Sequence, residues 1–184
     1  MDTNNCTWPA NDSLMIDYHN NEWGVPLHED KKLFEFLVLD AFQAGLSWKT
    51  ILHKRENFRL LFDGFDPEKI ALFDENKVQQ LLLDTSIIRN QSKIRATITN
   101  AKAFLNIQKE FGSFDKYIWQ FTNGNTLTNY PKINAEIACN SAESDAMSKD
   151  LIKRGFKFVG STICYAFMQA AGMVNDHLEG CSCK

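Results

Sequence analysis

Apolar residues recur at helical spacing along most of this chain, and the runs begin at residues that typically cap helices. After Asp30, which is interpreted as an N-cap, Leu33, Phe34, Phe36 and Leu37 follow at this spacing. Further helix starts are expected at Ser47, Asp66, Asp74, Ser113, Ser144 and Ser161. Residues 1–24 and 122–140 lack the pattern and are expected to be irregular, and no run alternates strictly as a strand would. The sequence therefore predicts an all-α fold.

Length and composition restrict the class of protein further. With 184 residues, of which 44% are hydrophobic, the chain is expected to form one domain with a substantial core. A net charge of −3 excludes a general polycation that would hold nucleic acid without specificity, but a local basic face remains possible. Because no signal peptide or membrane span is predicted, we expect a cytoplasmic protein whose five cysteines are reduced.

The segment from Leu39 to Leu52 places a single carboxylate in an apolar run. Asp40 lies in that run, and Trp48 follows a Gly-Leu-Ser break in which Gly45 permits a bend and Ser47 caps the next helix. An acid and an indole held together at such a bend suit a flat, cationic, aromatic ligand. The alternative is that Asp40 only caps a helix end and Trp48 belongs to the core.

Histidine and cysteine pairs near the two ends of the chain could form one metal site. His177 and Cys181 have a workable ligand spacing, and Cys6 and His19 lie near the other end. Two thiolates and two imidazoles around Zn²⁺ would form a neutral, closed tetrahedral site that joins the two terminal segments. Cys183 could compete with Cys181, and the alternative is that these are unbound thiols and surface histidines.

A short polar turn over residues 85–93 connects two apolar helical patterns. The turn carries Arg89, Asn90, Gln91 and Lys93, which together with free N–H groups at the next helix start could bind a DNA phosphate. This helix-hairpin-helix arrangement lacks the usual glycines, so an ordinary helix connection is the alternative.

Several blocks of the chain resemble one known family, the zinc-containing bacterial 3-methyladenine DNA glycosylase I. The resemblance covers nearly the whole chain and keeps the order of the family's motifs. It is carried by the blocks at residues 18–26, 43–48, 54–57, 87–89, 93–94, 154–160 and 174–177.

The resemblance implies a helix-hairpin-helix glycosylase over residues 1–184, with a base pocket between two helical lobes. It implies zinc ligands at Cys6, His19, His177 and Cys181. The implied substrate is N3-methyladenine, flipped out of double-stranded DNA and released as free base.

The residues agree with such a substrate, because methylation at N3 makes the base cationic. An electron-rich aromatic box and a carboxylate favour a cationic ring. The box could consist of Trp8, Tyr18, Trp23 and Trp48, with Asp40 as the catalytic carboxylate. No lysine stands out as a Schiff-base nucleophile, so a monofunctional enzyme is expected.

One position departs from the family pattern, which often has Glu where this chain has Asp40. The side chain is shorter by about 1.5 Å. The sequence thus also allows a lesion-binding module with weak or no excision, or a zinc-stapled helical protein with another partner. A monomer is the simplest expectation for an enzyme that encloses one flipped nucleotide.

Overall fold

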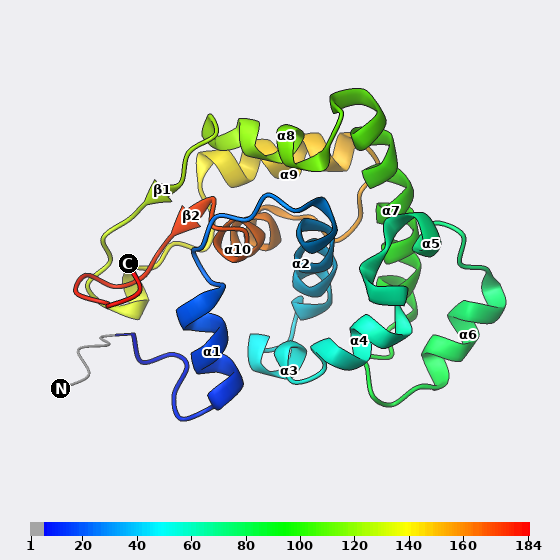
Figure 1. Cartoon of the computed structure of the whole chain (residues 1–184), viewed down its shortest axis with the longest axis horizontal. Helices are drawn as coiled ribbons and strands as arrows, with labels where there is room; N and C mark the ends of the chain where they lie inside the picture. Colours follow the sequence, from blue (N-terminus) through cyan, green and yellow to red (C-terminus); the bar gives the residue numbers. More distant parts are fainter. Residues whose placement is uncertain (1–5) are drawn as a thin grey trace.

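The computed structural model describes residues 6–184, and nearly all of its regular structure is helical (Figure 1). The α-helices are α1 (Ser13–Asn21), α2 (Asp30–Gln43), α3 (Trp48–Leu52), α4 (Arg55–Leu61), α5 (Pro67–Ile70), α6 (Glu75–Leu83), α7 (Gln91–Phe111), α8 (Phe114–Ile118), α9 (Ala142–Lys153) and α10 (Ser161–Ala170). Short 3₁₀ helices span Asp63–Phe65, Trp119–Thr122 and Asn134–Glu136. The predicted all-α class is confirmed, apart from one pair of two-residue strands.

Helix α2 lies in the middle of the fold and is packed on several sides. It contacts α3, α7, α8 and α10, and its residues from Leu33 to Phe42 are all buried. Aromatic stacking extends this core, with ring centroids 4.9 Å apart for Phe34 and Phe104 and 4.3 Å apart for Phe104 and Phe114. Because α2 is enclosed in this way, side chains near its C-terminus are held in fixed positions.

Helices α6 and α7 are consecutive, contact each other and are joined by the polar turn between Leu83 and Gln91. The side chain of Asp74 accepts from Lys77 N at the start of α6, and that of Asn90 accepts from Lys93 N at the start of α7. Helix α7 ends at Gly112, whose φ of 87° is the left-handed C-cap conformation that glycine adopts without strain.

Three of the sequence expectations about helices were wrong. Residues 1–24 are not wholly irregular, because α1 begins behind Asp12, whose carboxylate accepts from Met15 N. Asp30 is not an N-cap: it is the first residue of α2 and accepts from Phe114 N and Asp115 N, so a tertiary contact replaces the local one. The cap of α9 is Ser141 and not Ser144, which is the N3 residue of the same capping box.

The C-terminal tail returns to the N-terminal part of the chain. Strands β1 (Leu127–Thr128) and β2 (Val174–Asn175) pair in parallel, with Leu127 opposite Val174. Just before β2, Gly172 lies in a turn and has a φ of 67°. A Cβ atom added to this residue would overlap the backbone of Val25. This turn therefore needs glycine, and it brings the tail beside the segment that follows α1. None of the helices between residues 6 and 184 is long and apolar enough to span a membrane.

Candidate active site

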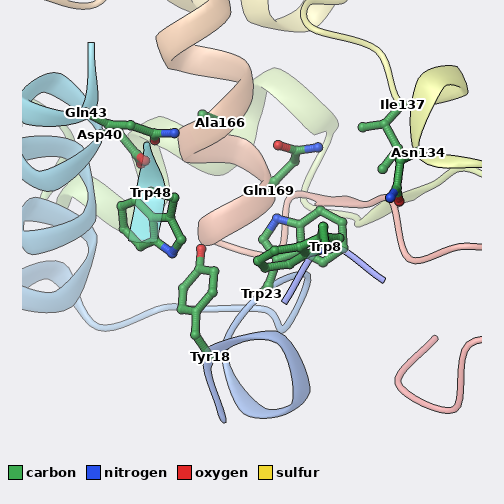
Figure 2. A pocket seen from close by; sticks show the side chains of 10 residues that line it. All are labelled: Trp8, Tyr18, Trp23, Asp40, Gln43, Trp48, Asn134, Ile137, Ala166 and Gln169. Atoms are coloured by element: carbon green, nitrogen blue, oxygen red, sulfur yellow. The ribbon is translucent and has the colours of Figure 1, made fainter. Parts of the chain in front are cut away.

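A cavity of about 340 Å³ opens between α1, α2, α3 and α10 (Figure 2). Its lining combines four large aromatic side chains with one carboxyl group and a few amides. The lining residues are Trp8, Tyr18, Trp23, Asp40, Gln43, Trp48, Asn134, Ile137, Ala166 and Gln169. All five residues expected from the sequence to bind or act on the base are therefore brought together in one cavity.

The four aromatic residues form two contacting pairs. The ring centroids of Trp8 and Trp23 are 5.2 Å apart with an interplanar angle of 74°, and those of Tyr18 and Trp48 are 5.0 Å apart at 48°. Trp8 and Tyr18 link the pairs edge to face at 6.4 Å. Such a wall of ring faces attracts a flat cation, because each face carries the negative side of the ring quadrupole.

Asp40 is buried with 2% of its surface exposed, and it lies one turn before the end of α2. No described protein group donates to its Oδ2 atom. Burial raises the pKa of this carboxyl group well above its ordinary value. The Asp40 side chain does not cap the end of α2. Its unpaired Oδ2 atom lines the cavity and is available to a ligand.

Trp48 is the first residue of α3, and its indole Nε1 is a buried donor without a partner among the described residues. The bend that places it forms as expected: Gly45 has φ of 79°, and Ser47 Oγ accepts from Thr50 N. The cavity thus holds an unpaired acceptor on α2 and an unpaired donor on α3. A ligand that satisfies both must present a donor and an acceptor of its own.

Sequence reasoning missed several residues of the lining, among them Gln43 and Gln169. Gln43 could have been found, because it lies three residues after Asp40 and so shares its helical face. Gln169 had no such signal, since it comes from α10, far away in the sequence. Asn134 and Ile137 belong to a loop whose path the sequence does not predict.

A cluster of thiols and imidazoles lies where the two ends of the chain meet. Potential ligand atoms of Cys6, His19 and Cys181 all lie within 4.8 Å of one another, as do those of His19, His177 and Cys183. The distance from Cys181 Sγ to His19 Nε2 is 3.8 Å, close to the S···N edge of about 3.5 Å that a tetrahedral zinc site has. His19 belongs to both groups, which makes the cluster continuous.

The two histidines are oriented by neighbouring amides. His19 Nδ1 lies 2.7 Å from Asn20 Oδ1, and His177 Nδ1 lies 2.9 Å from Asn175 Oδ1. The bond to Asn20 places the proton of His19 on Nδ1 and leaves its Nε2 as the ligand atom. Nε2 of His177 lies 3.2 Å from the backbone carbonyl oxygen of His19. Burial also lowers the pKa of His177, which favours the neutral imidazole that binds metals.

The cluster and the cavity share a wall. The Trp23 ring lies 4.7 Å from that of His177, and the Trp8 ring lies 5.4 Å from that of His19, measured between centroids. The histidines of the cluster are therefore in direct contact with the aromatic side of the cavity.

The residues expected to contact DNA differ in their surroundings. Arg89 and Asn90 are exposed in the turn before α7, and Gln91 is exposed as the first residue of that helix. Lys93 is buried, and its ammonium donates to the carbonyl oxygens of Phe42 (2.8 Å) and Ala44 (2.6 Å). The Lys93 ammonium therefore binds the C-terminal end of α2 and does not point to solvent, where a DNA phosphate contact was expected.

The chain is similar to known proteins along nearly its whole length. The sequence model described as methyladenine glycosylase matches residues 8–184. DNA-3-methyladenine glycosylase 1 of Escherichia coli (strain K12) is 50% identical over 178 residues, which cover 97% of this chain and 95% of that protein. DNA-3-methyladenine glycosylase of Haemophilus influenzae is 43% identical over 182 residues, covering 99% of this chain and 98% of that protein.

Solved structures agree with the sequence comparison. One of them, described as the structural basis of 3-methyladenine recognition by the 3-methyladenine DNA glycosylase I of Staphylococcus aureus, superposes with a TM-score of 0.95 at 33% identity. The superposition covers 100% of this chain and 98% of that one. The likeness therefore extends to the arrangement of every helix that lines the cavity.

Proposed function

The chain belongs to the methyladenine glycosylase family, and on this basis we propose that it releases 3-methyladenine from alkylated double-stranded DNA by hydrolysing the N-glycosidic bond. The observation that carries the proposal is the unpaired, buried Oδ2 of Asp40 in a cavity walled by Trp8, Tyr18, Trp23 and Trp48. Free 3-methyladenine is the product, and an abasic site remains in the DNA.

The charge of the substrate explains why these residues suit the reaction. A base methylated at N3 is cationic in DNA and becomes neutral when the glycosidic electron pair leaves with it. The leaving group therefore needs little help from a general acid. Asp40 binds the cationic ring, and the aromatic faces add cation–π attraction, so this lesion is preferred over neutral adenine. Water supplies the hydroxyl group that joins C1′ and releases a proton.

The cavity also favours a monofunctional enzyme. A lyase of the Schiff-base type needs an amine at the reacting carbon. The residues that line the cavity include no lysine, and the buried Lys93 ammonium is already bonded to two carbonyl groups. We therefore propose that the reaction ends at the abasic site, without strand cleavage.

The hairpin of α6 and α7 is the proposed helix-hairpin-helix contact with DNA. Arg89 and Asn90 are exposed at its turn, and Gln91 is exposed at the start of α7. The first N–H groups of this helix have no partner within the helix, and the Asn90 side chain accepts from the backbone N–H of Lys93. These residues would hold the backbone while the lesion is flipped, a step that costs a few kcal/mol in unstacking. Lys93 would act from inside, by fixing the end of the helix that carries Asp40. We propose that the protein does this as one domain and as a monomer.

The Cys/His cluster fits a structural zinc ion. Cys6, His19 and Cys181 form one group, and His177 joins His19 in a second group that includes Cys183. With His177 as the fourth ligand, the two thiolates and two imidazoles would give a neutral set of the kind that structural zinc prefers. Zinc bound there would tie the N-terminal segment to the C-terminal tail and would take no part in the chemistry. The supporting features are the burial of all four side chains and the amide that orients each imidazole.

A second candidate follows from the shorter carboxylate. The family pattern often has Glu at this position, and Asp40 reaches about 1.5 Å less far. A pocket that binds the lesion but orients it poorly would form a damage-binding module with weak excision. Asp40 keeps the recognition role in our proposal, with discrimination retuned by the shorter reach.

Base release from methylated duplex DNA, followed by chromatography, separates these possibilities. We expect wild type and Asp40→Glu to release 3-methyladenine, and Asp40→Asn to lose at least about 100-fold in rate, as other electrostatic groups of active sites do. Asp17→Asn is the matched control, because Asp17 is exposed on α1, where its Oδ1 accepts from Asn21 Nδ2. Release by Asp40→Glu alone would favour the binding module. No release by any variant would refute the glycosylase proposal.

A further inference from the structure

A buried carboxylate behind the cavity collects three donors. Asp176 is 1% exposed, and its Oδ2 accepts from the Tyr165 hydroxyl (2.8 Å) and from Gln169 Nε2 (2.7 Å). Its Oδ1 accepts from Asn129 Nδ2 at 2.7 Å. These bonds come from α10 and from the segment beside β1, so Asp176 cannot turn without breaking several of them.

This arrangement fixes which end of the Gln169 amide faces the cavity. Because carboxylate oxygens accept, the Gln169 nitrogen must point to Asp176 and its oxygen must point away. In Figure 2 the Gln169 oxygen lies on the side toward Asp40 and Trp48, and the nitrogen lies on the opposite side. Between residues 6 and 184 no group donates to this oxygen, although Gln169 lines the cavity. An oriented acceptor therefore faces the ligand from α10.

We propose that Gln169 is a further specificity residue that accepts a hydrogen bond from the exocyclic amino group of the flipped base. This inference rests on the proposed function. The Gln169 carbonyl and the Asp40 carboxylate face the cavity from α10 and α2, so a base with an oxo group in place of the amino group brings an acceptor toward acceptors. Gln169 thereby selects 6-aminopurines against 6-oxopurines, and Asp176 and Tyr165 are positioning residues that fix its orientation.

The test compares the binding of two free bases, 3-methyladenine and 3-methylhypoxanthine, by isothermal titration. Wild type should prefer the amino base. Gln169→Met keeps the length of the side chain but removes the acceptor, and its preference should fall about five- to tenfold, as loss of one hydrogen bond implies. Gln108→Met is the matched control: Gln108 is also half-buried and donates to an aspartate, Asp30, at 2.6 Å, but it lies on α7 away from the cavity.

A second variant separates orientation from stability. Asp176→Asn allows the Gln169 amide to turn and present its nitrogen, so the preference should shift toward the oxo base. A merely structural role would weaken both bases alike. Zinc content is measured in parallel, since Asp176 precedes His177. If Asp176→Asn does not fold, the ratio of affinities measured for Gln169→Met still tests the role of Gln169.

The inference is wrong if Gln169→Met keeps the wild-type ratio of affinities while Gln108→Met also keeps it. Such a result would leave base release from DNA by wild type intact, so the proposed function would stand without this residue. Failure of wild type to release any base would refute both.

Discussion

Asp40 and Trp48 face the same cavity, and each turns a buried polar atom toward it, Oδ2 and Nε1, that no described protein group satisfies. Buried polar atoms are normally paired, and leaving one unpaired costs about 1–3 kcal/mol. The two atoms come from helices joined by the bend at Gly45, and both residues line the same cavity. A ligand with one donor and one acceptor relieves both costs when it binds.

Removing the charge at position 40 should stabilise the empty protein. Asp40→Asn keeps the size of the side chain and removes a buried carboxyl group without a partner for Oδ2. We expect the melting temperature at neutral pH to rise by about 2–4 °C, while excision falls. Calorimetry measures this change. A lower melting temperature than wild type would mean that Asp40 stabilises the fold, contrary to the structure.

The same variant should show a defined dependence on pH. Burial raises the pKa of Asp40, so the folded protein holds this proton more tightly than the unfolded chain does. The associated stability is complete below the unfolded pKa of about 3.9 and is lost as the pH rises toward the raised folded value. The advantage of Asp40→Asn should thus be near zero at pH of about 3.5 and should grow toward neutrality. An advantage that is constant with pH would contradict the assigned cause.

Trp48→Phe should weaken base binding without loss of stability. The substitution keeps a ring in the wall and removes the unpaired Nε1 donor, so affinity for free 3-methyladenine should fall about five- to tenfold. Trp119→Phe is the matched control, because its Nε1 donates to the Leu27 carbonyl at 3.0 Å. That variant should lose stability and keep its affinity. Equal destabilisation of the two variants in urea would argue against an unsatisfied Nε1 at Trp48.

The fold was largely predictable because most helix boundaries here are local. The capping residues contact backbone within one turn of their own helix, as their residue types predict. They are the N-caps Asp66 (followed by Pro67), Asp74 and Ser113, and the C-cap Gly112. Asp30 was misread because its carboxylate is used by Phe114 N and Asp115 N from a distant segment. Tertiary contacts of this kind are not encoded in the spacing of nearby residues.

The candidate site was predictable where a residue's chemistry is unusual for its surroundings. A carboxylate in an apolar run singled out Asp40, and Trp48 followed a bend. Lys93 could not be placed in this way. A lysine next to a polar turn is typical of a surface cation, and its carbonyl partners come from the end of α2, which is distant in the sequence. Gln169 depends on Asp176 in the same way, through three-dimensional proximity.

Lys93→Met should destabilise the protein and reduce base binding together. Methionine fills the space of the aliphatic stem but leaves the carbonyl groups of Phe42 and Ala44 without this donor, at a cost of about 1–3 kcal/mol. Because these carbonyls end the helix that carries Asp40, affinity for 3-methyladenine should also fall. Lys102→Met, at an exposed site on α7, is the control. Urea unfolding of the two variants gives the comparison, and equal midpoints would exclude a positioning role for Lys93.

Loss of a proposed metal ligand should lower the stability of the protein, because the proposed zinc ion has a structural role and no part in the reaction. Cys6→Ser should lower the zinc content well below one per chain and make the melting temperature insensitive to chelators, whereas wild type should melt earlier after chelation. Cys139→Ser is the control, since Cys139 is exposed. Cys181→Ser should keep some zinc, because Cys183 lies with His19 and His177, but should release it at least about tenfold faster. Full zinc retention by Cys6→Ser would remove Cys6 from the proposed set.

Arg89→Ala should weaken DNA binding without affecting the pocket. A phosphate contact contributes counterion release, so the slope of log affinity against log salt should become shallower by about one. Free 3-methyladenine should bind as in wild type, because Arg89 is exposed at the turn before α7 and does not line the cavity. Lys109→Ala is the matched control, as Lys109 is an exposed cation near the other end of this 21-residue helix, about 30 Å away. Fluorescence anisotropy over a salt series measures both slopes. If Arg89→Ala leaves the slope unchanged, the DNA contact lies elsewhere on the surface. If Lys109→Ala changes the slope by the same amount, the effect comes from the overall charge of the protein and not from a contact at the hairpin.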